Sequence, residues 1–110
     1  MIEEAIILAG GLGKRLKSEL DELPKSMAPI NGIPFLTYQL DYLKEYGVKT
    51  VFLAVGYLSE VIIDYYSDNY KGIKIHYSIE KEPLGTGGAI SQALSFTKSN
   101  QILIVNGDTF

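Results

Sequence analysis

Residues 8–15 have a composition that suits phosphate binding. The segment follows a run of apolar residues, and glycines placed after a strand let backbone N–H groups come close to a phosphate. A plain glycine-rich turn with a solvated basic pair explains the same residues equally well, because short glycine patterns occur in many unrelated proteins. The segment contains three glycines and then two cations: Gly10, Gly11, Gly13, Lys14 and Arg15.

The two commonest phosphate motifs do not fit this segment. A Walker-type loop ending at residues 13–14 requires glycine at position 8 and serine or threonine at position 15, where this chain has Leu8 and Arg15. A dinucleotide fingerprint that starts at Gly11 requires a small residue at position 16, where the chain has Leu16. As a phosphate loop, the segment is therefore of a different kind.

Lys25 is the second candidate. Pro24 and Pro29 stiffen the segment around it as extended chain, which can hold the lysine in a fixed place. A lysine suits a phosphate as a point charge. Taken alone, a surface lysine in a proline-rich loop is the stronger interpretation.

Residues 80–89 form the third candidate. Gly85, Thr86 and two further glycines lead into a predicted helix, whose N-terminus favours negative charge. Glycine backbone can pack against a flat base or ribose, and Glu80 or Glu82 can accept hydrogen bonds from a base amino group. The alternative is a long connection that needs glycine to turn.

Asp108 is the fourth candidate, because it follows the last apolar run of the chain. A carboxylate in that place suits Mg²⁺ carried by a nucleotide. A helix cap or an Asx-turn is the alternative, and for a lone aspartate it is the commoner one. His76 lies among apolar strand residues and is interpreted as structural or surface.

Composition excludes several classes of protein. The chain has 110 residues, no cysteine, one histidine and a net charge of -3, which fits one globular domain without thiol or His-cluster chemistry. Nothing in that charge favours nucleic acid or an anionic membrane. The N-terminal apolar run is too short for a signal or a membrane span, so we expect a cytoplasmic protein.

The hydrophobic pattern predicts alternating strands and helices. Tyrosines between residues 38 and 70 recur at helical spacing and are predicted to pack, while residues 10–33 are expected to be irregular, with a short helical turn near residues 15–18. The predicted strands are residues 5–9, 48–55, 73–79 (half exposed) and 101–105. The predicted helices run from Pro34 to a stop at Gly47, from a cap at Ser59 through Tyr66, and from Ala89 through Phe96.

This alternation predicts an open, mostly parallel α/β sheet of the Rossmann-like kind. The glycine segment at residues 10–15, the loop at residues 80–88 and the pair at residues 107–108 all follow predicted strands. In such sheets ligands bind at the carboxyl ends of the strands. The candidate residues are therefore expected to meet at one edge.

In this order, residues 8–16, 23–27, 84–89 and 106–108 resemble the sugar-nucleotide pyrophosphorylase (sugar-1-phosphate nucleotidyltransferase) family. The resemblance covers nearly the whole chain. It implies a GT-A-like fold, with residues 1–110 as its N-terminal, nucleotide-binding part and with the sugar-binding C-terminal part absent. Residues 27–32, 82–89 and 106–110 look closest to enzymes that make GDP-D-glycero-D-manno-heptose from GTP and heptose 1-phosphate for cell-surface polysaccharides.

The resemblance also implies roles for individual residues. A sugar 1-phosphate oxygen attacks the α-phosphorus of a nucleoside triphosphate in line, and pyrophosphate leaves. Arg15 neutralises the departing pyrophosphate, Lys25 grips the phosphates at the reacting centre, and Asp108 binds Mg²⁺. The nucleotide-binding residues implied are Leu8, Ala9, Gly10, Gly11, Gly13, Glu80, Gly85 and Thr86.

Two positions depart from the usual family pattern. Lys14 stands where threonine is usual and adds a charge near the triphosphate, and Ser26 stands where proline is usual and is expected to loosen the lysine loop. Other sugars and bases, a catalytically silent nucleotide- or sugar-sensing module, and a homo-oligomer stay open. A Rossmann-type cofactor domain is disfavoured by the absent third glycine.

Overall fold

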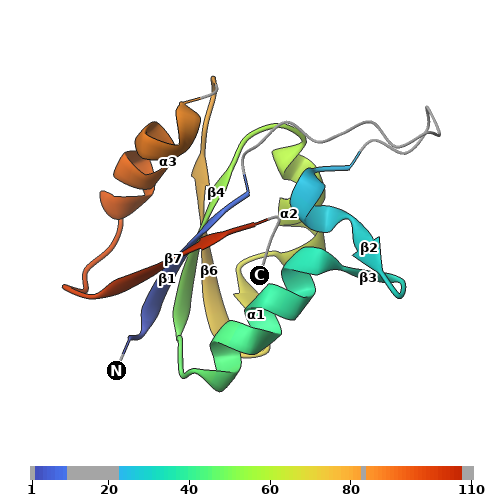
Figure 1. Cartoon of the computed structure of the whole chain (residues 1–110), viewed down its shortest axis with the longest axis horizontal. Coiled ribbons are helices and arrows are strands. Elements are labelled where there is room, and N and C mark those ends of the chain that lie inside the picture. Colours follow the sequence, from blue (N-terminus) through green and yellow to red (C-terminus); the bar gives the residue numbers. More distant parts are fainter. Residues whose placement is uncertain (1, 10–22, 83, 108–110) are drawn as a thin grey trace.

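Strands and helices alternate along the chain as the sequence predicts. The computed structural model of the protein describes residues 2–9, 23–82 and 84–107 (Figure 1). The strands are β1 (Glu4–Leu8), β2 (Pro29–Ile30), β3 (Ile33–Pro34), β4 (Thr50–Val55), β5 (Asn69–Tyr70), β6 (Ile73–Ile79) and β7 (Ile102–Asn106). The helices are α1 (Phe35–Glu45), α2 (Ser59–Tyr66) and α3 (Gly85–Leu94), with a short 3-10 turn, η1 (Lys25–Met27).

Five of the strands form one sheet in the order β5-β6-β4-β1-β7. The neighbours β6, β4, β1 and β7 run parallel, and only β5 is antiparallel. The interior strand β1 is buried on both faces, with Ala5, Ile6 and Ile7 fully buried. The predicted open, mostly parallel α/β sheet is confirmed.

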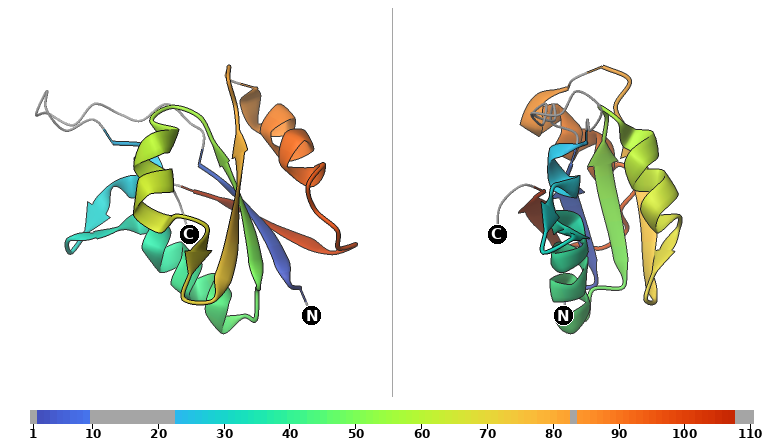
Figure 2. Two further views of the ribbon diagram at one scale, coloured as in Figure 1. Left: turned by 180° about the vertical axis from the view of Figure 1, so that it is seen from behind. Right: turned by 90° about the vertical axis from the view of Figure 1, so that its right-hand side faces the viewer.

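The helices lie on opposite faces of this sheet (Figures 1 and 2). On one face α1 and α2 cover a large apolar core, which includes Ile7 of β1 and Leu53 of β4. On the other face α3 contributes Ala93 to a small core with Ile6 and Phe52. Because side chains alternate along a strand, neighbouring residues of β1 belong to different cores.

Helix α1 follows from its residue spacing. Leu36, Leu40 and Leu43 recur at helical period and are all buried against the sheet. The helix stops as predicted at Gly47, whose φ of 88° is the left-handed conformation that glycine adopts easily. The N–H of Gly47 donates to the Lys44 carbonyl, and that of Val48 donates to the Leu43 carbonyl, which is the Schellman pattern of a helix end.

Two short hairpins were not predicted. Residues 29–34, expected to be irregular, form the β2–β3 hairpin, in which Asn31 and Gly32 both have positive φ. That geometry is a type I′ turn, for which Asn-Gly is the preferred sequence. In the second hairpin, Lys71 and Gly72 also have positive φ, and their turn joins a short strand, β5, to β6.

Several other details differ from prediction. Ser59 is the first residue of α2 and not its cap, which is Leu58 in a left-handed conformation. The predicted strand limits at residues 5–9, 48–55 and 101–105 are off by one or two residues. The tyrosines are only partly packing residues, since Tyr66 is buried while Tyr42, Tyr46 and Tyr65 are at least half exposed. No helix among the described residues is long and apolar enough to cross a membrane.

Candidate nucleotide site

The carboxyl ends of β1, β4, β6 and β7 meet at one edge of the sheet. This edge is where open α/β sheets bind ligands. Three backbone hydrogen bonds join neighbouring strand ends there: Ala9 N–H to the Ala54 carbonyl (2.8 Å), Glu80 N–H to the Val55 carbonyl (2.7 Å) and Gly107 N–H to the Leu8 carbonyl (2.9 Å). The prediction that the candidate segments share an edge is confirmed for the described residues.

Gly107 brings the end of β7 very close to the end of β1. A Cβ on this residue would lie 2.5 Å from the Leu8 carbonyl oxygen, so only glycine fits. Asp108 lies outside the described residues, and its role as a metal ligand stays a prediction.

Gln39 is a residue of this edge that sequence reasoning missed. It lies on the buried face of α1 at 2% exposure, and its side-chain Nε2 donates to the Asn106 carbonyl at 2.8 Å. The amide thus fixes the end of β7 from the helix side. The signal was available, because Gln39 is a polar residue at the apolar helical spacing of Leu36 and Leu43.

Lys25 is held by a compact turn and not by extended chain. The residues 25–27 form the 3-10 turn η1, in which the Met27 N–H donates to the Pro24 carbonyl at 2.8 Å. Pro24, Ser26 and Met27 are buried whereas Lys25 is exposed. Ser26 thus packs inside the turn. The turn itself contradicts the extended segment that the two prolines predicted.

Met27 links this turn to the carboxyl edge. It belongs to the same apolar core cluster as Ala9, which follows β1 directly. The turn also joins the start of α1, since the Phe35 N–H donates to the Ala28 carbonyl at 3.0 Å. The turn that carries Lys25 is therefore anchored in the main core.

Glu80 shapes the loop between β6 and α3. Its Oε1 accepts a hydrogen bond from the Leu84 N–H at 3.1 Å, which brings the end of β6 to the start of the helix. The side chain is half-buried. A carboxylate has two oxygens and several acceptor positions, so it can hold the loop and still accept hydrogen bonds from a base.

The glycines predicted to lie in a loop form the first turn of α3. Gly85, Thr86 and Gly87 are exposed, and no side chain caps the helix at Leu84. A Cβ at Gly87 would meet no protein atom within 4 Å, so internal packing does not require glycine there. The bare turn leaves backbone N–H groups open at a helix N-terminus, which favours anions.

The structure brings six of the predicted site residues to one sheet edge, on different elements. Leu8 and Ala9 end β1, Lys25 lies on the adjoining turn, and the other three follow β6: Glu80, Gly85 and Thr86. The remaining candidates lie outside the described residues: Gly10, Gly11, Gly13, Arg15 and Asp108. The described residues contain no group of three His, Cys, Asp or Glu side chains that could hold a metal ion.

A family model for the MobA-like NTP transferase domain matches residues 5–110. The chain belongs to this NTP transferase family. The match includes every segment that forms the carboxyl edge. Solved nucleotidyltransferase structures share the fold of this chain.

Two relatives that share more than half of their matched residues with this chain are guanylyltransferases. The chain is 60% identical to the D-glycero-α-D-manno-heptose 1-phosphate guanylyltransferase of Campylobacter jejuni over 97% of its own length and 48% of the relative's. It is 56% identical to the enzyme of the same name from Aneurinibacillus thermoaerophilus, over 96% of this chain and 46% of that one. The chain thus spans about half the length of the curated relatives it matches.

Solved structures give the same fold. HddC of Yersinia pseudotuberculosis, solved as a complex with GMP-PN, matches with a TM-score of 0.84 and 42% identity, over 97% of this chain and 48% of that chain. A UDP-glucose pyrophosphorylase complexed with UDP-glucose has the same TM-score at 21% identity, over 98% and 46%. The second match bears on the fold alone.

Proposed function

We propose that this chain is the nucleotide-binding part of an enzyme that transfers a guanylyl group from GTP to a heptose 1-phosphate. A phosphate oxygen of the sugar attacks the α-phosphorus of GTP, the bond from that phosphorus to the bridging oxygen breaks, and pyrophosphate leaves. The product is a GDP-heptose for cell-surface polysaccharide synthesis. The sugar-binding residues belong to the part of the enzyme that this chain does not match.

The observation that carries this proposal is the 60% identity to the Campylobacter jejuni enzyme over nearly the whole chain. The geometry of the carboxyl edge supports it, because an acidic side chain and an uncapped helix start lie together there. Glu80 offers carboxylate oxygens to the N1–H and amino group of guanine, a donor pair that uracil and thymine lack. The open first turn of α3 lies next to Glu80 and offers backbone to the ribose and phosphates.

Catalysis in this proposal depends on positioning and charge neutralisation. Lys25, exposed on a turn that is anchored in the core, neutralises charge on the phosphates as the α-phosphorus is attacked. Arg15 neutralises the leaving pyrophosphate. Mg²⁺ held by Asp108 would supply further neutralisation of the triphosphate. His76 has no part in it, because its ring packs between Phe52 and Phe96.

The proposal is tested with the complete protein, Mg²⁺ and a panel of nucleotides and sugar 1-phosphates. We expect pyrophosphate release and a GDP-sugar from GTP with heptose 1-phosphate, and much slower release from UTP, CTP or dTTP. Nucleotide binding without any nucleotide-sugar across the panel would leave a sensing module as the function. A faster reaction with another base or sugar would correct the substrate.

Lys25→Ala tests the role of the lysine. We expect kcat/KM to fall about 10²- to 10³-fold, since one preorganised charge at the reacting phosphates is lost. The matched control is Lys49→Ala, because Lys49 is an exposed lysine at the opposite end of the sheet, paired with Glu3 at 3.0 Å. The control should stay within about twofold of the wild type. An equal fall in kcat/KM for both variants would mean that Lys25 is not part of the site.

A further inference from the structure

Gln92 lies on α3 and reaches the end of β6, directly before Glu80. Its side-chain Nε2 donates to the Ser78 hydroxyl at 2.9 Å and to the Ile79 carbonyl at 3.0 Å. An amide NH2 group has two protons, so both are used on adjacent residues of one strand. The two hydrogen bonds hold the last residues of β6 from the helix side.

Both acceptors depend on this side chain. The Glu80 N–H donates to the Val55 carbonyl of β4, and direction alternates along a strand, so the Ile79 carbonyl points away from β4. On that side of β6 the described strand is β5, which pairs with residues 73 and 74 and not with the end of β6. Ser78 is 1% exposed, so its hydroxyl needs a partner within the protein.

Helix α3 is held to β6 at two levels. At its start, the Leu84 N–H donates to Glu80 Oε1 at 3.1 Å. About two turns after Gly85, Gln92 makes its two hydrogen bonds to the same strand end. The apolar core on this face is small and contains Ala93 of the helix. The polar contacts therefore fix where α3 starts relative to Glu80.

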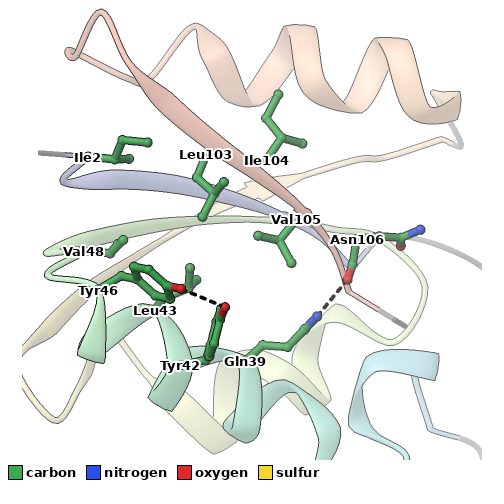
Figure 3. Close-up of a pocket in the computed structure, with 10 residues that line it drawn as sticks. All are labelled: Ile2, Gln39, Tyr42, Leu43, Tyr46, Val48, Leu103, Ile104, Val105 and Asn106. Atoms are coloured by element: carbon green, nitrogen blue, oxygen red, sulfur yellow. Dashed lines mark hydrogen bonds between the residues drawn. The ribbon is translucent and has the colours of Figure 1, made fainter. Parts of the chain in front are cut away.

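A glutamine on the other face of the sheet holds a different strand end. Figure 3 shows the Gln39 side chain of α1 reaching the end of β7, where its Nε2 donates to the Asn106 carbonyl at 2.8 Å. Side-chain amides thus fix strand ends at the carboxyl edge from both faces. The strand end that Gln92 holds is the one that leads into the loop of Glu80.

We propose that Gln92 is a positioning residue for base recognition, which acts by fixing the place of the Glu80 carboxylate. This role rests on the proposed function, in which that carboxylate accepts from the N1–H and the amino group of guanine. A carboxylate accepts from two neighbouring donors only where both distances suit, and hydrogen bonds weaken steeply away from their best geometry. Loss of the Gln92 amide should therefore weaken base recognition more than the binding of ribose and phosphates.

The test compares the affinities of the complete protein for GTP and for inosine triphosphate by calorimetry. Inosine triphosphate has the ribose, triphosphate and N1–H of GTP and lacks only the amino group, so the ratio of the two affinities measures recognition of that group. In the wild type GTP should bind at least about tenfold more tightly, because the amino group donates to a charged acceptor. Gln92→Leu keeps a good helix former and removes both donors, and it should lower the ratio to about threefold or less.

Ser95→Ala is the matched control. Ser95 follows α3, and its Oγ donates to the Gln92 backbone carbonyl at 2.6 Å, so the substitution removes a hydrogen bond and leaves the Gln92 amide in place. The affinity ratio should stay within about twofold of the wild type. An unchanged ratio in Gln92→Leu, or an equal fall in both variants, would overturn the proposal.

Glu80→Gln separates this role from the proposed function. The substitution should lower the affinity ratio by itself, and the double variant with Gln92→Leu should lose no more, because both substitutions act on one contact. If Glu80→Gln keeps the wild-type ratio, the base contact of the proposed function is wrong, and the role of Gln92 is wrong with it. If Glu80→Gln lowers the ratio and the effect of Gln92→Leu adds to it in full, only the role of Gln92 is wrong.

Discussion

The two faces of the sheet are stabilised in different ways. On the α1/α2 face, fully buried aliphatic side chains such as Leu40 and Leu53 form a continuous core. On the α3 face, the described part of the chain has a small cluster of three buried apolar residues. Polar groups hold that face: the Gln92 side chain donates to Ser78 Oγ and to the Ile79 carbonyl, and Glu4 accepts from the loop between α3 and β7.

The candidate site uses both faces. The turn that carries Lys25 is anchored in the large core through Met27, while the glycine turn of α3 starts on the lightly packed face. A lysine that must meet a phosphate at a fixed point benefits from rigid support. A backbone that a base and ribose must approach benefits from having no side chains over it. Stability and ligand access are therefore divided between the two faces of the sheet.

The largest effect is expected in the large core. Leu40→Ala should lower the free energy of unfolding by about 3–4 kcal/mol, because a fully buried leucine leaves a cavity when it is truncated. The matched control is Leu94→Ala on α3, where the leucine is 42% exposed and a loss below about 1 kcal/mol is expected. Urea denaturation measures both. Equal losses of unfolding free energy in the two variants would contradict the difference in packing between the two faces.

A smaller effect, of opposite sign, is expected at the glycine turn. Gly87→Ala should raise the free energy of unfolding by about 0.5 kcal/mol, since alanine suits a helix better and its Cβ meets no protein atom within 4 Å. The same methyl group would stand where a nucleotide approaches, so GTP affinity should fall about tenfold. Calorimetric titration of the complete protein measures this affinity.

The neighbouring glycine supplies the control for that substitution. A Cβ at Gly88 would lie 2.8 Å from the Leu84 Cβ, so Gly88→Ala should destabilise the helix start instead of stabilising it. If Gly87→Ala gains stability without losing affinity, the open turn is not part of the nucleotide site.

Elements with a strong local pattern were predictable from sequence. The apolar run of β1 and the leucine spacing of α1 with its stop at Gly47 need no tertiary information. The sheet edge followed from them, because parallel strands in an α/β fold end on the same side. The sequence therefore predicts that residues 10–15, 80–88 and 107–108 lie at one edge.

The errors arose where two local signals compete or where the decisive contact is distant. Asn31-Gly32 is a strong hairpin signal, but the flanking prolines favoured irregular chain, and the hairpin has only two residues in each strand. Ser59 has the composition of a cap, yet Leu58 takes that position. Gln39 was missed because its partner, the Asn106 carbonyl, is 67 residues away in sequence.

The last expected effect is at Glu4, and it concerns how the stability of the α3 face responds to pH. Burial raises the pKa of this carboxyl, but hydrogen bonds from the Ser99 and Lys98 N–H groups outweigh burial and lower the pKa below its ordinary 4.5. A group whose pKa is lower in the folded state stabilises the fold above its unfolded pKa, and loses that contribution as pH falls through the folded value.

Glu4→Gln should therefore cost about 1 kcal/mol at pH 7, because a charge-assisted pair of hydrogen bonds becomes a neutral one, and the cost should shrink as pH falls below 4.5. Urea denaturation of wild type and variant between pH 7 and about pH 3 measures this difference.

Glu3→Gln is the control, since Glu3 is an exposed residue in a surface pair with Lys49 and should change stability by less than about 0.5 kcal/mol. The deficit of Leu40→Ala should stay constant over the same range, because a leucine side chain does not titrate. If the loss of stability in Glu4→Gln does not change with pH, the two faces of the sheet do not differ in how their stability responds to pH.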